Sequence, residues 1–102
     1  MNGIPALIDR FDADGETLQG MVNELRGQLG VILLGGVANN TVALVAAVSP
    51  QFTGKVQAGK LIQQIASIVG GKGGGKPDSA RGVGKDASKL DEALAKARSL
   101  LG

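Results

Sequence analysis

The sequence predicts an α/β (α+β) domain in which helices cover a small mixed sheet of about three to four strands. The chain has 102 residues, a length that suits one compact core. Two apolar, β-branched runs flank Asn39-Asn40, and three other segments repeat apolar residues at helical spacing. We therefore expect one globular domain over residues 1–102, with the order strand, helix, strand, strand, helix, loop, helix.

The first strand and helix are predicted near the amino-terminal end. Residues 6–11 combine apolar and polar side chains, and we expect them to form a short strand that the turn at residues 12–15 closes. Asp14 can cap the next helix, and Gly30 can end it in a left-handed conformation. The apolar face of this helix is formed by Leu18, Met21, Val22, Leu25 and Leu29.

The runs VILLGGVA and TVALVAAVS predict a β-hairpin, because the two residues between them, Asn39 and Asn40, tolerate positive φ. Strands that are apolar on both faces indicate a central position with helices on either side. A membrane-spanning helix over residues 31–48 is the alternative. Asn39, Asn40 and Thr41 would then lie at the bilayer centre, where unpaired amides are costly, so we favour the buried sheet.

Two further helices are expected in the second half of the chain. The first covers residues 56–69, and Gly70 lies just beyond it; its apolar face is formed by Leu61, Ile62, Ile65, Ala66, Ile68 and Val69. Asp86 or Ser88 can cap the second, in a motif resembling a capping box, Ser88-Lys89-Leu90-Asp91. Its apolar residues are Leu90, Ala93, Leu94, Ala97, Leu100 and Leu101.

The composition excludes several kinds of chemistry. Cysteine and histidine are both absent, so disulfides, thiolate metal sites, the usual zinc ligands and the usual proton shuttle at neutral pH are missing. The amino-terminal residues do not resemble a secretory signal. We therefore expect a cytoplasmic binding module with no membrane partner, and not a complete enzyme.

Charge is distributed unevenly along the chain. Residues 1–54 carry two basic and five acidic side chains, a net charge of −3, whereas residues 55–102 carry nine basic and four acidic ones, a net charge of +5. The second half therefore has the charge expected of a surface for a polyanion.

Residues 70–85 read GGKGGGKPDSARGVGK, with seven glycines, four cations and one carboxylate in sixteen residues. Glycine loses the most backbone freedom on folding, so an ordered segment of this kind needs a compensating interaction. Runs of glycine can form concave nests of backbone amides that favour phosphate. The predicted binding residues are Lys72, Gly73, Gly74, Gly75, Lys76, Arg81 and Lys85. A flexible connector with solvated lysines is the alternative.

The same segment does not match a P-loop. Gly70, Gly75 and Lys76 fit the spacing G-x-x-x-x-G-K, but Pro77 replaces the Ser or Thr whose hydroxyl would hold magnesium. The segment also follows a predicted helix, whereas a P-loop follows a strand. We therefore do not expect a nucleoside triphosphatase.

Together with its flanks, this segment resembles the C-terminal domain of alanyl-tRNA synthetase, one of the DHH-associated domains. Members of that family combine apolar strands, a helix with Ala-Gly near its start, a Gly-Gly-Lys-Gly-Gly-Gly-Arg-Pro-Asp motif and a final helix. The corresponding elements here are Ala58-Gly59, residues 70–78, Ala80 and Asp86. The resemblance covers residues 6–101 and departs from the family pattern at Lys76, where Arg is common, at Ser79 and at residues 81–84.

The resemblance implies a fragment of a longer alanine-tRNA ligase, a cytoplasmic enzyme of protein biosynthesis. Aminoacylation and editing would occur in amino-terminal domains that this chain lacks; ATP, magnesium and zinc would be used there, with no cofactor in the fragment. The expected partners are tRNA for alanine and the other domains of the parent synthetase, and residues 70–85 would bind the RNA. Other cations could extend the binding surface, namely Lys55, Lys60, Lys89, Lys96 and Arg98.

Two other functions stay open. Related domains beside the catalytic half of DHH phosphoesterases use a glycine-rich loop, often ending in Gly-Gly-Gly-His, to hold a nucleotide substrate. Lys76 stands at the place of that histidine. The chain could also be a dimerisation module, whose apolar helix faces pair in a homodimer.

Overall fold

The computed structural model describes residues 6–25, 28 and 30–101 and contains one mixed sheet, with the spatial order β1-β2-β3-β5-β4. The strands are β1 (Ala6–Phe11), β2 (Val31–Ala38), β3 (Thr41–Val48), β4 (Lys72–Gly75) and β5 (Ser79–Gly84). The helices are α1 (Gly15–Leu25), α2 (Ala58–Ala66) and α3 (Leu90–Leu101), with short 3-10 helices at Pro50–Phe52 (η1) and Ala87–Lys89 (η2). The predicted class, a mixed sheet covered by helices, is confirmed, but the sheet has five strands instead of three to four.

The first strand and helix follow their sequence signals. β1 has the predicted bounds and pairs in parallel with β2, because α1 returns the chain between them. The Asp14 carboxylate accepts a 2.9 Å hydrogen bond from the backbone amide of Thr17, which confirms the predicted helix cap. α1 ends at Leu25, earlier than predicted, and the expected contribution of Leu29 falls outside the described residues.

The Asn39-Asn40 turn joins β2 to β3 as predicted. Both residues have positive φ, 52° and 62°, the values that a two-residue hairpin turn requires. Because residues 31–48 form two paired strands, the membrane-helix alternative is wrong. Among the helices that the structure describes, none is long and apolar enough to cross a membrane.

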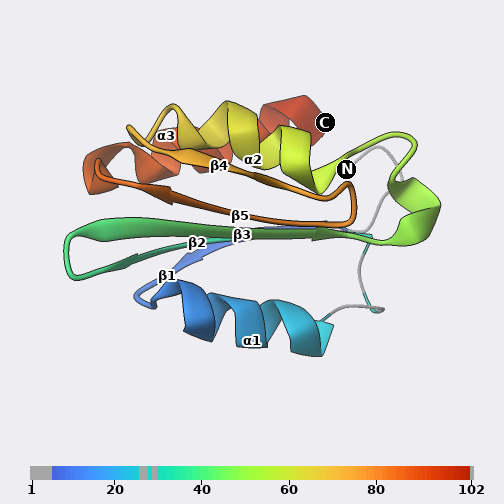
Figure 1. Cartoon of the computed structure of the whole chain (residues 1–102), viewed down its shortest axis with the longest axis horizontal. Coiled ribbons are helices and arrows are strands. Elements are labelled where there is room, and N and C mark those ends of the chain that lie inside the picture. Colours follow the sequence, from blue (N-terminus) through green and yellow to red (C-terminus); the bar gives the residue numbers. More distant parts are fainter. Residues whose placement is uncertain (1–5, 26–27, 29, 102) are drawn as a thin grey trace.

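Helices lie on both faces of the sheet, so the central strands β2 and β3 are buried on each side (Figure 1). Alternate residues of β2 enter two separate cores, with Leu33 facing α2 and α3 and Leu34 facing α1. The burial of one such leucine contributes about 1.5 to 3 kcal/mol to folding. α1 packs mainly on β2 and β3, so it leaves most of the same face of β5 and β4 uncovered.

Residues 70–85 fold as a β-hairpin and not as the predicted loop. β4 and β5 pair antiparallel, and β5 pairs with β3, so the flexible-connector alternative is also wrong. Glycine is depleted in most strands, but here it allows helix α2 to approach the hairpin. A Cβ added at Gly73 would lie 2.4 Å from the side chain of Ile62, and one at Gly84 would lie 2.4 Å from that of Val69.

The turn of this hairpin also closes the amino-terminal end of α2. The backbone amides of Ala58 and Gly59 donate to the carbonyls of Pro77 (2.7 Å) and Lys76 (3.1 Å). Those two amides have no partner within the helix, so the turn satisfies them. α2 is shorter than the predicted 56–69, because the chain turns after Ala66.

The start of the last helix differs from its prediction. A 3-10 helix, Ala87–Lys89, precedes α3, which begins at Leu90. The hydroxyl of Ser88 donates to the carboxylate of Asp86, and Asp86 makes no side-chain bond to the backbone of the 3-10 helix. Ser88 therefore lies inside a 3-10 turn and does not occupy the predicted capping-box position.

Candidate nucleic-acid interface

The side chains of β5 alternate between a buried and an exposed face. Ala80, Gly82 and Gly84 are buried toward α2, whereas Arg81 and Val83 are exposed on the opposite side. Lys72 pairs with Val83 across β4 and β5, so it starts from the same side. We call this side of the β4–β5 hairpin, with Lys72, Arg81 and Val83, the open face.

Four of the predicted binding residues form a basic strip along the hairpin, namely Lys72, Lys76, Arg81 and Lys85. Three hollows that share lining residues connect them in pairs: Lys85 with Lys72, Lys72 with Arg81, and Arg81 with Lys76. Lys76 and Lys85 lie at opposite ends of the strip. None of the four makes an ion pair or hydrogen bond through its side chain to another described residue. Their charges are therefore available to a partner.

The predicted nest of glycine amides is wrong, because residues 72–75 form an extended strand. Lys76 and Ser79 exchange both backbone hydrogen bonds at the turn. Hydrogen-bonded pairs alternate in an antiparallel ladder, so the amide of Gly74 points to β5. The amides of Gly73 and Gly75 point away from β5, at the edge of the sheet. Of the three predicted glycines, Gly73 and Gly75 therefore keep their amides outside the β4–β5 ladder.

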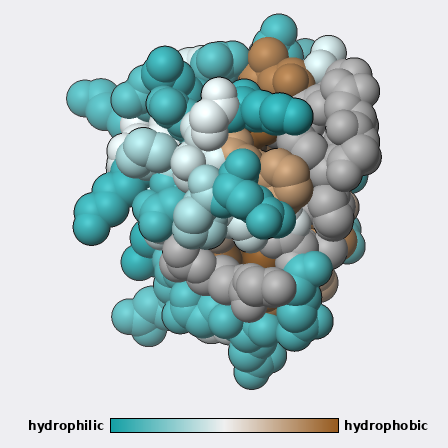
Figure 2. Space-filling model, turned by 90° about the vertical axis from the view of Figure 1, so that its right-hand side faces the viewer, coloured by the Kyte–Doolittle hydropathy of each residue, from teal (hydrophilic) through white to brown (hydrophobic). Residues whose placement is uncertain are grey.

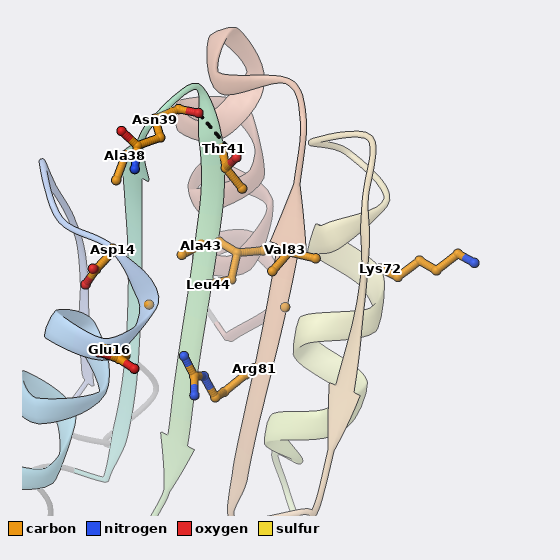
Figure 3. A pocket seen from close by; sticks show the side chains of 12 residues that line it. Asp14, Glu16, Ala38, Asn39, Thr41, Ala43, Leu44, Lys72, Arg81 and Val83 are labelled. Atoms are coloured by element: carbon orange, nitrogen blue, oxygen red, sulfur yellow. Dashed lines mark hydrogen bonds between the residues drawn. The ribbon is translucent and has the colours of Figure 1, made fainter.

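A cleft of about 480 Å³ separates α1 from β5. One side is formed by Asp14 and the start of α1, with Gly15 and Glu16. Arg81 reaches from β5 on the other side, and its guanidinium lies against Gly15. Figure 3 shows that Glu16 and Arg81 point toward each other across β3, while Lys72 extends away from the cleft past β4. We call this feature the α1–β5 cleft. Its floor includes Ala43 and Val83, and Asn39 and Thr41 lie at one end.

The α1 wall of the cleft is negative. A hydrogen bond from the backbone amide of Thr17 lowers the pKa of Asp14 below its ordinary value, so this carboxyl is ionised at neutral pH. Sequence reasoning did not find the contributions of Asp14 and Glu16 to the cleft. No local pattern places them beside Arg81, because the fold alone brings residues 14–16 and 81 together.

The cations of the helices are placed differently. Lys60 and Lys96 are exposed on α2 and α3, which cover the face opposite to α1, so they do not continue the basic strip. Arg98 donates to the carbonyl of Ile8 at 3.1 Å and holds α3 against β1. Lys55 lies in a separate hollow next to Lys60. These four cations therefore do not extend the basic strip, whereas Lys89 is exposed in η2, four residues after Lys85.

The end of the molecule that carries the β4–β5 turn has a largely hydrophilic surface. Figure 2 views this end and shows mostly hydrophilic side chains over its described part, interrupted by hydrophobic areas at the top and near the centre. Lys76 lies at this turn. Among the described residues, no group of three His, Cys, Asp or Glu side chains could hold a metal ion. The site can therefore act through charge and shape.

The fold and the strip define a small α+β domain with one basic, open sheet face. The DHHA1 domain model matches residues 3–102, and the chain belongs to this family. Its structure is similar to that of the C-Ala domain from Aquifex aeolicus alanyl-tRNA synthetase, with a TM-score of 0.82, 25% identity, and coverage of 95% of this chain and 88% of that one. The predicted family resemblance is thus confirmed.

The sequence relatives are much longer proteins. Alanine--tRNA ligase of Pseudomonas syringae pv. tomato is 49% identical over 98 residues, which cover 93% of this chain and 11% of the relative. Alanine--tRNA ligase of Idiomarina loihiensis is 43% identical over 104 residues, which cover 99% and 12%. This chain therefore spans about a ninth of the length of these ligases.

Proposed function

We propose that this chain is the carboxy-terminal tRNA-binding domain of an alanyl-tRNA synthetase. In this role it holds tRNA for alanine, while other domains of a cytoplasmic parent protein carry out aminoacylation and editing with ATP, magnesium and zinc. The domain itself catalyses no reaction. Support comes from the identity of up to 49% with alanine-tRNA ligases and from the fold shared with a C-Ala domain.

The observation that carries this proposal is the placement, along the β4–β5 hairpin, of cations whose side chains make no ion pair or hydrogen bond with another described residue. In a strand each residue adds about 3.4 Å, so the four steps from Lys72 to Lys76 span about 14 Å. Lys85 follows two residues beyond Val83, the partner of Lys72, which lengthens the strip to about 20 Å. Such a row of charges suits the phosphates along one side of an RNA strand.

Binding by this strip is electrostatic and reads shape more than sequence. Each phosphate that a cation neutralises releases counterions, so the logarithm of the affinity falls with the logarithm of salt concentration by about 0.7 to 0.9 per contact. Four contacts give a slope of about −3 to −4. RNA duplexes are recognised mainly through phosphates and 2′-hydroxyls, which the amides of Gly73 and Gly75 can contact at the sheet edge.

The test is a titration of the domain with tRNA for alanine, an unrelated tRNA and a single-stranded RNA at several salt concentrations. Lys72→Ala is expected to weaken binding to all three and to reduce the slope by about one. Lys96→Ala, on the opposite face, serves as the matched control and should leave both the RNA affinity and the salt slope unchanged. Binding that ignores salt, or that loses nothing in Lys72→Ala, Lys76→Ala and Arg81→Ala combined, would refute the proposal.

The homodimer remains a separate prediction. Gel filtration with light scattering over a range of protein concentrations measures it directly. A mass that rises from monomer to dimer supports self-association, and a constant monomer mass excludes it for this domain.

A further inference from the structure

The α1–β5 cleft has two walls of opposite charge that do not satisfy each other. Glu16 and Arg81 point toward each other across β3, yet neither side chain forms an ion pair or hydrogen bond with another described residue. Both flank a floor that includes Ala43 and the half-exposed Val83. A ligand placed between them could bond to both charged groups at once.

The chemistry of the two walls selects the ligand. A phosphate would be repelled by Asp14 and Glu16, and a simple cation would be repelled by Arg81. The apolar floor favours a ligand with a flat apolar face. The ligand therefore needs such a face, one edge that donates hydrogen bonds to a carboxylate and another edge that accepts them from a guanidinium.

Guanine meets these conditions better than the other nucleobases. Its N1 and N2 groups are adjacent donors that match the two oxygens of a carboxylate, and its O6 and N7 atoms accept both bonds of an arginine fork. Adenine presents an acceptor, N1, on the corresponding edge. We propose that the α1–β5 cleft binds a guanine base whose Watson–Crick edge is free, with Glu16 accepting from N1 and N2 and Arg81 donating to O6 and N7.

This inference rests on the proposed function, because bound RNA is the source of guanine that the basic strip would bring to the cleft. Lys72 is among the residues that line the same cleft, and its side chain extends outward past β4, so it can neutralise a phosphate of the same strand outside the cleft. The basic strip and the cleft then have different roles. The strip supplies affinity and its salt dependence, whereas Glu16 and Arg81 supply a preference for one base.

The experiment compares short single-stranded RNAs of uridine that carry one central guanine, inosine, 7-deazaguanine or adenine. Inosine lacks the 2-amino donor that would face Glu16, and 7-deazaguanine lacks the N7 acceptor that would face Arg81. Fluorescence anisotropy of the 102-residue chain gives each affinity. Guanine is expected to bind about fivefold more tightly than adenine, the lower end of the range for one bidentate base contact, with the two analogues in between.

Three variants test whether Glu16 is responsible for the preference for guanine. Glu16→Gln, which replaces one of the two acceptor oxygens by a donor, should reduce the difference between guanine and inosine without weakening binding of the adenine RNA. Glu24→Gln, which removes an exposed carboxylate of the same helix outside the cleft, should retain the difference. Lys72→Ala should weaken all four RNAs by a similar factor and leave their ratios unchanged.

The outcomes separate the two proposals. Equal affinity for the four RNAs, with normal salt dependence and a normal Lys72→Ala effect, overturns the guanine site and leaves the proposed function intact. If no RNA binds, the proposed function fails, and guanosine monophosphate then tests the cleft alone. Larger amide NMR shifts at Gly15 and Glu16 with guanosine than with adenosine monophosphate support the site, whereas equal or absent shifts overturn it.

Discussion

The guanidinium of Arg81 lies over Gly15, with its Nη2 nitrogen only 2.6 Å from the position that a Cβ at residue 15 would occupy. This contact joins the start of α1 to the uncovered strand β5. It depends on the absence of a side chain at residue 15, since an added methyl group would force the flexible end of Arg81 to move. The contact with Gly15 of α1 therefore helps to determine the direction in which the Arg81 side chain points.

Gly15→Ala is expected to displace the Arg81 guanidinium without removing its charge. The preference for guanine over adenine RNA should then decline toward equal affinity, while the salt dependence of RNA binding stays as in the wild type. Fluorescence anisotropy measures both quantities. Gly20→Ala is the matched control, because a Cβ at Gly20 meets nothing within 4 Å. An unchanged base preference in Gly15→Ala would show that the position of Arg81 does not matter.

Gly59→Ala should destabilise the domain, against the usual effect of alanine in a helix. A Cβ at residue 59 would lie 2.6 Å from the carbonyl oxygen of Gly75, and backbone atoms cannot move aside as a flexible side chain can. Separating α2 from β4 is expected to cost about 1 to 3 kcal/mol of the free energy of unfolding. Urea denaturation with an unchanged m-value measures this loss.

Gly20→Ala is the matched control for that experiment too. Gly20 is exposed in α1, so alanine should stabilise the domain by up to about 1 kcal/mol through its higher helix propensity. Changes of opposite sign in the free energy of unfolding, a decrease for Gly59→Ala and an increase for Gly20→Ala, would establish the close packing of α2 on β4. A stabilising Gly59→Ala would mean that the helix lies farther from the strand than the structure indicates.

Some parts of the fold could be predicted because their signals are local. Asp14 precedes a helical pattern, and Asn39-Asn40 separates two β-branched runs. β4 and β5 could not be predicted in this way, since Gly73 and Gly84 resemble loop residues by composition. Glycine occurs at these two positions because of tertiary packing: each provides space for a side chain of α2 or of the turn that follows α2.

The same distinction holds for the candidate site. Lys72, Lys76, Arg81 and Lys85 could be proposed from composition and family resemblance, because they lie within sixteen residues of sequence. Their arrangement in a strip follows from the pairing of β4 with β5. The negative wall of the cleft could not be predicted, since Glu16 meets the β5 side of the cleft only through the order of strands in the sheet.

Asp14 should make the stability of the domain sensitive to acid. Its folded-state pKa is lowered, chiefly by the hydrogen bond from the Thr17 amide. The contribution of Asp14 to the stability of the folded domain is therefore fully present above the unfolded pKa of about 4. It is lost as the pH falls through the lower folded-state value. Asn at this position can still cap the helix but does not titrate.

The expected result is a melting temperature that falls less steeply in Asp14→Asn than in the wild type as the pH is lowered from 5 to 2.5. Thermal denaturation followed by circular dichroism measures both curves. Asp12→Asn, which changes an exposed carboxyl that caps no helix, should follow the wild type. A wild-type advantage that grew toward low pH would contradict the sign of the pKa shift.

Val83 offers the most direct test of the open face. It is 58% exposed, and it pairs with Lys72 between the two ends of the basic strip. Val83→Asp would place a negative charge among the cations without changing the core. One unit charge at about 4 Å in water is worth about 1 kcal/mol, so RNA affinity should fall about fivefold or more at low salt. The melting temperature should change little, because surface substitutions usually have small effects on stability.

Val83→Thr is the matched control, since threonine has a similar shape, suits a strand and carries no charge. It should bind RNA as the wild type does. Raising the salt concentration should bring the RNA affinity of Val83→Asp closer to that of the wild type, because salt screens an exposed charge. Wild-type affinity in Val83→Asp at low salt would place the RNA on another surface of the domain. A loss shared by Val83→Thr would instead indicate that the shape of the open face matters more than its charge.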